Sequence, residues 1–179
     1  MSTAFSASLT SDVSTGATFT LVFRIAHAAL SAAGQPQCRV TLTPPSAGSL
    51  HLANVFIGTA HATNLYDFTG DQVRVTFGGA NDVTLTSGGG NHVSDWVNYS
   101  ILGSADINIA VDNGAYGAGT ARRLASDASV GYYYASVVDA ATAAKHLDAT
   151  FTYAGTLVDD VSLIEVLASV PRSFAALIG

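Results

Sequence analysis

The stretch Thr18-Phe-Thr-Leu-Val-Phe-Arg-Ile25 alternates large apolar residues with residues that are mostly polar. On an extended chain, one side carries Phe19, Leu21, Phe23 and Ile25, and the other carries Thr18, Thr20 and Arg24. Because successive side chains of a strand point to opposite faces, this pattern predicts a β-strand with one face in a core.

The composition extends this prediction to the whole chain of 179 residues, a length that suits one core. Apolar residues make up 49% of it and charged residues 11%, which excludes intrinsic disorder. Lys145 is the single lysine and Glu165 the single glutamate, so surface helices would lack their usual polar face. The 18 Thr, 18 Ser and 17 Gly favour strands and turns. We therefore predict an all-β fold.

Further segments with strand character follow, separated by turn signals. They are 37–43, 50–59, 73–77, 83–85, 92–101, 107–111, 131–135, 150–153 and 157–166. About ten short strands are typical of a two-sheet antiparallel β-sandwich or jelly roll. Segments 73–77 and 83–85 are predicted to form a hairpin, and 92–101 a single long strand. Segments 25–33 and 137–144 are predicted to form short helical turns.

The sequence divides into an N-terminal arm (1–17), the sandwich (18–166) and a C-terminal tail (167–179). The tail is apolar and contains Pro171, so it either docks on a partner or packs across the end of its own sandwich. The N-terminus has neither a basic start nor an apolar run of signal-peptide length. Cys38 is the single cysteine and is predicted to be a buried strand thiol. We expect a protein made in the cytoplasm.

The net charge and the absence of known catalytic motifs in the sequence argue against several classes of function. A formal charge of −6 leaves no broad basic surface for nucleic acid or anionic lipid, and no apolar run is long enough to span a membrane. None of the five histidines and twelve aspartates lies in a recognisable catalytic motif. A glycosidase would need two carboxylates placed across the scissile bond, and the sequence reveals no such pair. The chain is predicted not to be an enzyme.

Aromatic and basic residues are the candidates for contacting a glycan or a partner. Trp96, Tyr116 and one face of Tyr132-Tyr-Tyr134 could stack on sugar rings, with Tyr133 on the opposite face from its two neighbours. Arg122 and Arg123, in a glycine-rich loop, could hold an acidic sugar or a partner carboxylate; a solvated loop is the alternative.

Two adjacent acids, Asp159 and Asp160, open the last strand. On a strand they would point to opposite faces. A Ca²⁺ ion with extra backbone oxygens could relieve their repulsion, while a strand start left in water needs no metal.

Four segments resemble a jelly-roll domain found among accessory proteins of tailed phages and phage-like particles. They are 54–61 (Asn-Val-Phe-Ile-Gly-Thr-Ala-His), 66–79 with its Tyr-Asp-Phe and Val-Arg-Val-Thr-Phe-Gly-Gly runs, 93–100 (Val-Ser-Asp-Trp-Val-Asn-Tyr-Ser) and 131–134 (Gly-Tyr-Tyr-Tyr). The resemblance spans about residues 21–166. Residues 158–166 are also similar to the closing strand of carbohydrate-binding-module jelly rolls, in which aspartates often hold a structural calcium.

The first resemblance implies a virion component: a head spike or fibre, a capsid decoration or a receptor-binding domain of a tail fibre. It implies other virion proteins as partners, a homo-oligomer and contact with a host surface polysaccharide. It carries over no catalytic residue. A freestanding carbohydrate-binding module of a cell-surface or secreted system is the alternative.

Overall fold

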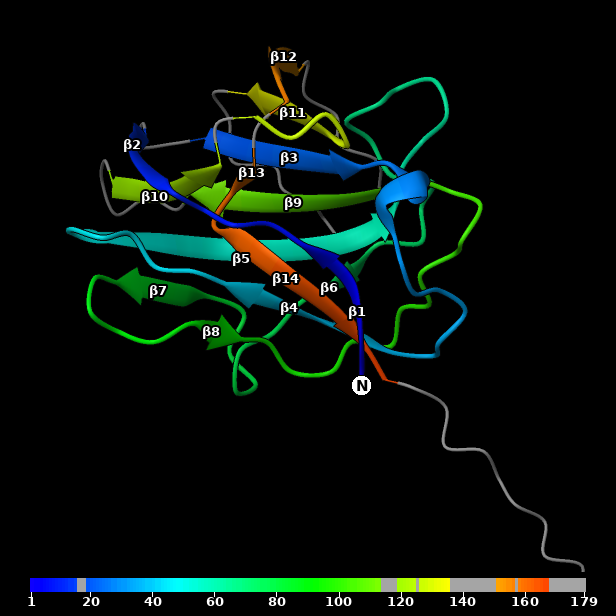
Figure 1. The fold of residues 1–179 in the computed structure, drawn as a ribbon, viewed down its shortest axis with the longest axis horizontal. Helices are drawn as coiled ribbons and strands as arrows, with labels where there is room; N and C mark the ends of the chain where they lie inside the picture. Colours follow the sequence, from blue (N-terminus) through cyan, green and yellow to red (C-terminus); the bar gives the residue numbers. More distant parts are fainter. Residues whose placement is uncertain (16–18, 114–118, 125, 136–150, 157, 168–179) are drawn as a thin grey trace, which may run out of the picture.

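Two antiparallel β-sheets face each other across the main core, and a small third sheet lies beside them (Figure 1). The computed structural model describes residues 1–15, 19–113, 119–124, 126–135, 151–156 and 158–167. The four-stranded sheet has the order β1 (Ser2–Ser6), β14 (Val161–Val166), β4 (Cys38–Leu42) and β8 (His92–Val93). The small sheet has the order β13 (Val158–Asp159), β10 (Gly119–Leu124) and β2 (Ser11–Thr15).

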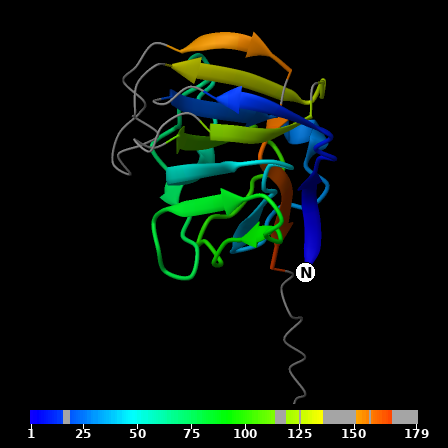
Figure 2. The same cartoon turned by 90° about the vertical axis from the view of Figure 1, so that its left-hand side faces the viewer.

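The largest sheet has seven strands (Figure 2). Its order is β12 (Thr152–Gly155), β11 (Val130–Ala135), β3 (Phe19–Ile25), β9 (Ile107–Asn113), β5 (Ser49–Thr59) and β6 (Val73–Arg74), and β7 (Val83–Thr86) also pairs with β5. The prediction of an all-β antiparallel sandwich is confirmed. The described residues form fourteen strands instead of about ten, because several pairings involve only two residues.

The alternation in β3 is confirmed. Leu21, Phe23 and Ile25 are at most 3% exposed and lie in the core between the sheets. Val22, between them, belongs to a second apolar cluster on the outer face of the seven-stranded sheet. This second cluster also contains Phe56, Phe68, Ala110, Tyr133, Ala135 and Phe151. The largest sheet therefore buries apolar side chains on both faces, and its outer face provides the base of the site described below.

The first residues of the chain lie within the sheets. β1 pairs with β14, and β2 pairs with β10, so segment 1–17 contributes two strands. Ala4 and Phe5 are buried in the main core. Ser2 is the register partner of Val166, which places the chain start beside the end of β14. In both views this edge lies on the opposite side of the molecule from β11 and β12 (Figures 1 and 2).

The predicted hairpin of 73–77 and 83–85 is wrong. β6 pairs with Phe56 and Ile57 of β5, and β7 pairs with residues 49–52 of the same strand. Because β5 is eleven residues long, both short strands fit along one edge of it, one after the other. The glycine-containing turn between them brings only Phe77 and Ala80 together.

The predicted long strand over 92–101 is also wrong, since β8 ends at Val93. The amide nitrogens beyond it bond to different neighbours: that of Ser94 to the Val40 oxygen, that of Asp95 to Thr76 and that of Val97 to Cys38. A continuous ladder cannot form when the partner changes in this way. Val93 is 46% exposed, whereas Val97, Tyr99 and Ile101 are buried, so they do not share its surroundings.

Two smaller predictions have clear outcomes. Segment 25–33 contains the 3₁₀ turn η1 (His27–Ala29), whereas 137–144 lies outside the described residues. Cys38 is fully buried in β4, and burial raises the pKa of its thiol to about 12. Its thiolate is therefore scarce near neutral pH, as expected for a packing residue. No helix in the described ranges has the length and hydropathy to cross a bilayer.

Candidate functional site

A cleft of about 510 Å³ opens beside the ends of β3 and β11 on the outer face of the seven-stranded sheet. It is lined by Arg24, Ala26, Leu65, Asp106, Ala128, Ser129, Val130, Gly131, Tyr133, Tyr153 and Thr156. A mainly apolar lining with a few polar groups is typical of small-molecule sites. Its charged lining residues, within the part of the chain that the structure describes, are Arg24 and Asp106.

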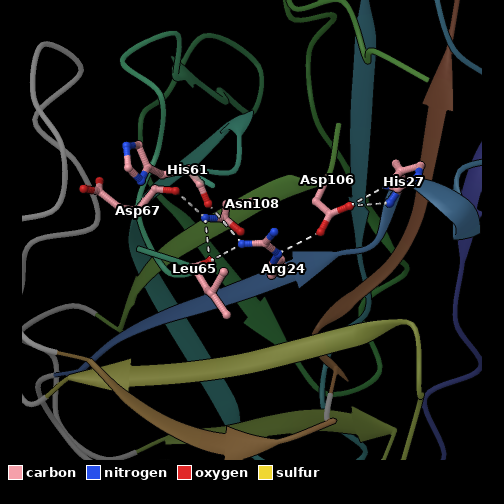
Figure 3. Close-up of polar contacts among 7 residues, drawn as sticks. All are labelled: Arg24, His27, His61, Leu65, Asp67, Asp106 and Asn108. Carbon is pink, nitrogen blue, oxygen red and sulfur yellow. Dashed lines mark hydrogen bonds and ion pairs between the residues drawn. The ribbon is translucent and has the colours of Figure 1, made fainter. Parts of the chain in front are cut away.

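One wall of the cleft is an ion pair between neighbouring strands (Figure 3). Arg24 lies on the outer face of β3, and Asp106 immediately precedes β9. Arg24 Nε donates to Asp106 Oδ2 at 2.8 Å. Asp106 Oδ1 accepts the backbone N–H of His27 at 2.9 Å and lies 2.8 Å from His27 Nδ1. Both side chains of the pair are about one-fifth exposed, so solvent and ligands reach them.

A loop between β5 and β6 forms the rim next to this ion pair. Asn108 Nδ2, on β9, donates to the carbonyl oxygens of Asp67 at 2.7 Å and of Leu65 at 3.3 Å. Arg24 Nη1 donates to the carbonyl of His61 at 3.1 Å. These bonds attach the loop to the sheet and hold Leu65 at the cleft edge, where it is 40% exposed.

The opposite wall is aromatic and depends on a glycine. Gly131 is the register partner of Arg24, and a Cβ at this position would lie 3.1 Å from Cε2 of Tyr133. The missing side chain therefore leaves room for the Tyr133 ring beside Arg24. Tyr153 pairs with Tyr133 across the strands, with ring centroids 5.3 Å apart, and is 56% exposed.

The end of the cleft is a turn fixed by Asp127. Its side chain accepts bonds from the backbone N–H of Ser129 at 2.9 Å and from the Ser129 hydroxyl at 2.6 Å. The Ala26 N–H bonds to the Ser129 carbonyl, and the Asp127 N–H bonds to the Thr156 carbonyl. The turn thus connects β3, β11 and β12 around the cleft and makes it a preformed hollow.

Asp106 and Tyr133, one from each wall, keep their charge states near neutral pH. Burial acts to raise the pKa of Asp106, but hydrogen bonds from His27 and Arg24 outweigh it and lower the pKa below 3.8. Burial raises the pKa of the Tyr133 hydroxyl above 10, although the nearby Arg24 charge opposes this. Asp106 is therefore a carboxylate and Tyr133 a neutral phenol under ordinary conditions.

Of the residues proposed from the sequence as contacts, Tyr133 lies in this cleft, and its face is opposite to that of Tyr132, as predicted. Trp96 lies elsewhere: the guanidinium carbon of Arg39 sits 4.8 Å from its ring centroid, and Arg39 Nε is bonded to Glu165 at 2.8 Å. Tyr116 lies outside the described residues.

Arg122 and Arg123 belong to strand β10 instead of a loop, which corrects the prediction for their surroundings. Arg122 Nη1 donates to Asp12 Oδ1 at 2.9 Å, whereas the Arg123 guanidinium carbon lies 5.6 Å from the ring centroid of Tyr132. The two cations therefore have different partners. Neither is among the residues that line the cleft.

The Arg122–Asp12 pair gives a prediction about acid stability. Hydrogen bonds from Ser46 and Arg122 lower the pKa of Asp12 from 3.8 to about 2. A carboxyl group with a lowered folded-state pKa stabilises the protein above pH 3.8, and the effect is lost as pH falls toward 2. We expect Asp12→Asn to cost about 1 kcal/mol at pH 7, because solvent reaches both side chains and screens the pair, and much less at pH 2, where the carboxyl is largely protonated in the unfolded chain and half protonated in the folded one. Melting curves of both proteins between pH 2 and 7 measure this, and parallel curves would contradict it.

Asp160 is buried and bonded to a neighbouring strand, as expected for a residue that stabilises the fold. It sits between β13 and β14 with φ at +58°, a left-handed conformation that aspartate tolerates. Its Oδ1 accepts the Arg122 N–H at 2.8 Å. The prediction that Asp159 and Asp160 are successive residues of one strand is wrong, because β13 ends at Asp159 and β14 begins at Val161. The side chain of Asp159 lies outside the described part of the chain. Within the described residues, no three His, Cys, Asp or Glu side chains are grouped to hold a metal ion.

Comparison with known proteins adds no assignment. No protein-family model matches the chain, and no curated protein sequence is significantly similar to it. The cleft must therefore be interpreted from its own chemistry.

Sequence reasoning missed most of the cleft, namely Arg24, Leu65, Asp106 and Tyr153. Arg24 had a detectable signal, because a charged residue within the apolar alternation of 18–25 must find a partner on the outer face. The others come from segments far apart in sequence. Tyr153 reaches the cleft through the pairing of β12 with β11, and Asp106 through the pairing of β9 with β3. Leu65 is held there by the bond from Asn108 Nδ2 to its carbonyl.

Proposed function

We propose that this protein is a non-enzymatic binding component of a phage or phage-like particle, and that it contacts a saccharide of the host surface through the cleft. The observation that carries the proposal is the pairing of an exposed tyrosine, Tyr153, with the Arg24–Asp106 ion pair across one preformed hollow. Saccharides offer apolar C–H faces and many hydroxyl groups, and these two walls complement them.

The position of the cleft fits a mounted protein. The chain start and the end of β14 lie side by side at one edge of the sandwich, while β11 and β12 lie at the other (Figure 1). A particle attached at the first edge would present the cleft outward. Many copies on one particle would turn weak contact at each site into firm attachment.

The carboxylate content of the cleft supports binding over hydrolysis. Glycosidases need an acid and a second carboxylate across the bond. Among the described residues that line the cleft, Asp106 is the one carboxylate, and its lowered pKa makes it a poor proton donor at neutral pH.

A freestanding carbohydrate-binding module would use the same cleft, so assembly distinguishes the two proposals. We expect light scattering after size exclusion to give a mass of three or more 18.3 kDa chains, since particle proteins form closed symmetric oligomers. We also expect binding on an array of bacterial surface saccharides. A monomer that binds saccharide would support the module, and an absence of saccharide binding would contradict both proposals.

A further inference from the structure

The hydrogen-bonding capacity left in the cleft defines the ligand further. Arg24 has five N–H donors. Nε donates to Asp106, and Nη1 donates to the carbonyls of His61 at 3.1 Å and Leu65 at 3.5 Å. Nη2 has no hydrogen-bond partner among the described residues, so two charged N–H donors remain available at the cleft wall.

Asp106 adds an acceptor beside these donors. A carboxylate offers about four acceptor positions. At Oδ1, His27 occupies two with its backbone N–H and Nδ1, and Arg24 Nε occupies one at Oδ2. One position on Oδ2 is left unused by the described residues. The wall therefore presents a donor group and an acceptor side by side, which is the arrangement that two neighbouring hydroxyl groups require.

The aromatic wall supplies the apolar contact. Tyr153 lies on β12, and more than half of its surface is exposed, whereas Tyr133 beneath it is 8% exposed. Tyr133 therefore supports the Tyr153 ring from below. The Tyr133 hydroxyl lies over Gly131, which is the register partner of Arg24. Leu65, 40% exposed, faces the same cleft from the loop. A sugar ring that enters the cleft meets the exposed tyrosine and the leucine with its apolar C–H face, while its hydroxyl groups reach the ion pair.

Charge selects among sugars. The Arg24 cation is already compensated by Asp106 at 2.8 Å, so the cleft has no net charge from its described charged lining. A uronic or sialic acid that approached Arg24 would bring its own carboxylate next to Asp106, and the two like charges would repel. The protein as a whole is also negative, with a formal charge of −6.

We infer that the cleft binds an uncharged saccharide unit, with Arg24 Nη2 and Asp106 Oδ2 sharing two neighbouring hydroxyl groups and Tyr153 stacking on the C–H face. This inference rests on the proposed saccharide-binding function and names the class of ligand. Arg24 and Asp106 recognise the two hydroxyl groups by hydrogen bonding, and Tyr153 supplies the apolar contact with the sugar ring.

The test uses the full chain and two immobilised panels: neutral hexose and N-acetylhexosamine oligosaccharides, and oligosaccharides that contain uronic or sialic acid. We expect binding to the neutral panel only. Tyr153→Ala should weaken this binding at least about tenfold, which is the scale of one lost aromatic contact. Leu102→Ala, at a residue 49% exposed and outside the cleft lining, is the matched control and should leave binding unchanged.

Asp106→Asn tests the role of charge. It keeps the side-chain shape but frees the Arg24 cation, so neutral binding should fall and binding to the acidic panel should appear. Circular dichroism and melting curves confirm that each variant is folded, and Tyr153→Ala tests the site even when Asp106→Asn does not fold. Wild-type preference for the acidic panel would overturn this inference alone. Binding to neither panel would overturn the proposed function as well.

Discussion

Replacing Phe68 with alanine is expected to lower the free energy of unfolding by about 3–5 kcal/mol, the usual cost of removing a buried phenylalanine. Phe68 is fully buried in the cluster on the outer face of the seven-stranded sheet, with Val22, Phe56 and Ala110. It comes from the loop between β5 and β6, and its ring fixes that loop to the sheet. Because the same loop carries Leu65 to the cleft, the proposed saccharide binding should also be weaker in this variant.

Urea unfolding monitored by circular dichroism measures the effect of Phe68→Ala. Leu65→Ala is the matched control, because Leu65 lies three residues away in the same loop but is 40% exposed. It should change the free energy of unfolding by less than about 1 kcal/mol. If Phe68→Ala cost no more than Leu65→Ala, the outer cluster would not hold the loop, and the cleft rim would not depend on the burial of Phe68.

The parts of the fold that sequence could predict are those set by side-chain alternation. In β3, the apolar residues 21, 23 and 25 indicated a core face, and that face is buried. The scarcity of Lys and Glu excluded surface helices, and the described residues contain only a single 3₁₀ turn. The alternation is a local feature and the scarcity of Lys and Glu is compositional. Both can therefore be interpreted without knowing which strands are neighbours.

Pairing was not predictable in the same way. The alternation in 92–101 looks like one strand, but its backbone groups bond to β4 and to Thr76 in turn. Likewise, β6 and β7 are close in sequence and pair with β5 instead of with each other. Long-range hydrogen bonding decides these outcomes, and a single sequence carries little information about it.

The candidate site shows the same division. The opposite faces of Tyr132 and Tyr133 followed from period two, and the structure confirms them. The partners of Tyr133 did not follow, because Tyr153 and Arg24 reach it only through the register of β11 with its two neighbours. Trp96 was a reasonable choice by residue type, yet it packs with Arg39 outside the cleft lining.

Gly58→Ala is expected to lower the free energy of unfolding by about 2–3 kcal/mol, which is typical of overpacking in a close-packed region. Gly58 lies in β5, where the loop that carries Phe68 crosses it. A Cβ here would lie 2.7 Å from Cδ1 of Phe68 and 2.8 Å from Cα of Gln72. The ring can shift, but the Gln72 backbone cannot move without displacing the loop from the sheet. Gly90→Ala is the control, since nothing lies within 4 Å of its added Cβ.

A double-mutant cycle separates the two contacts made by that added Cβ. In the Phe68→Ala background the ring contact is gone, but the contact at 2.8 Å with the Gln72 Cα remains. Gly58→Ala should therefore still cost more than about 1 kcal/mol in that background. A neutral effect would mean that the ring alone required the glycine. A persistent cost would mean that β5 and the loop backbone need this close approach, and that the cleft rim is built on a glycine that sequence patterns do not reveal.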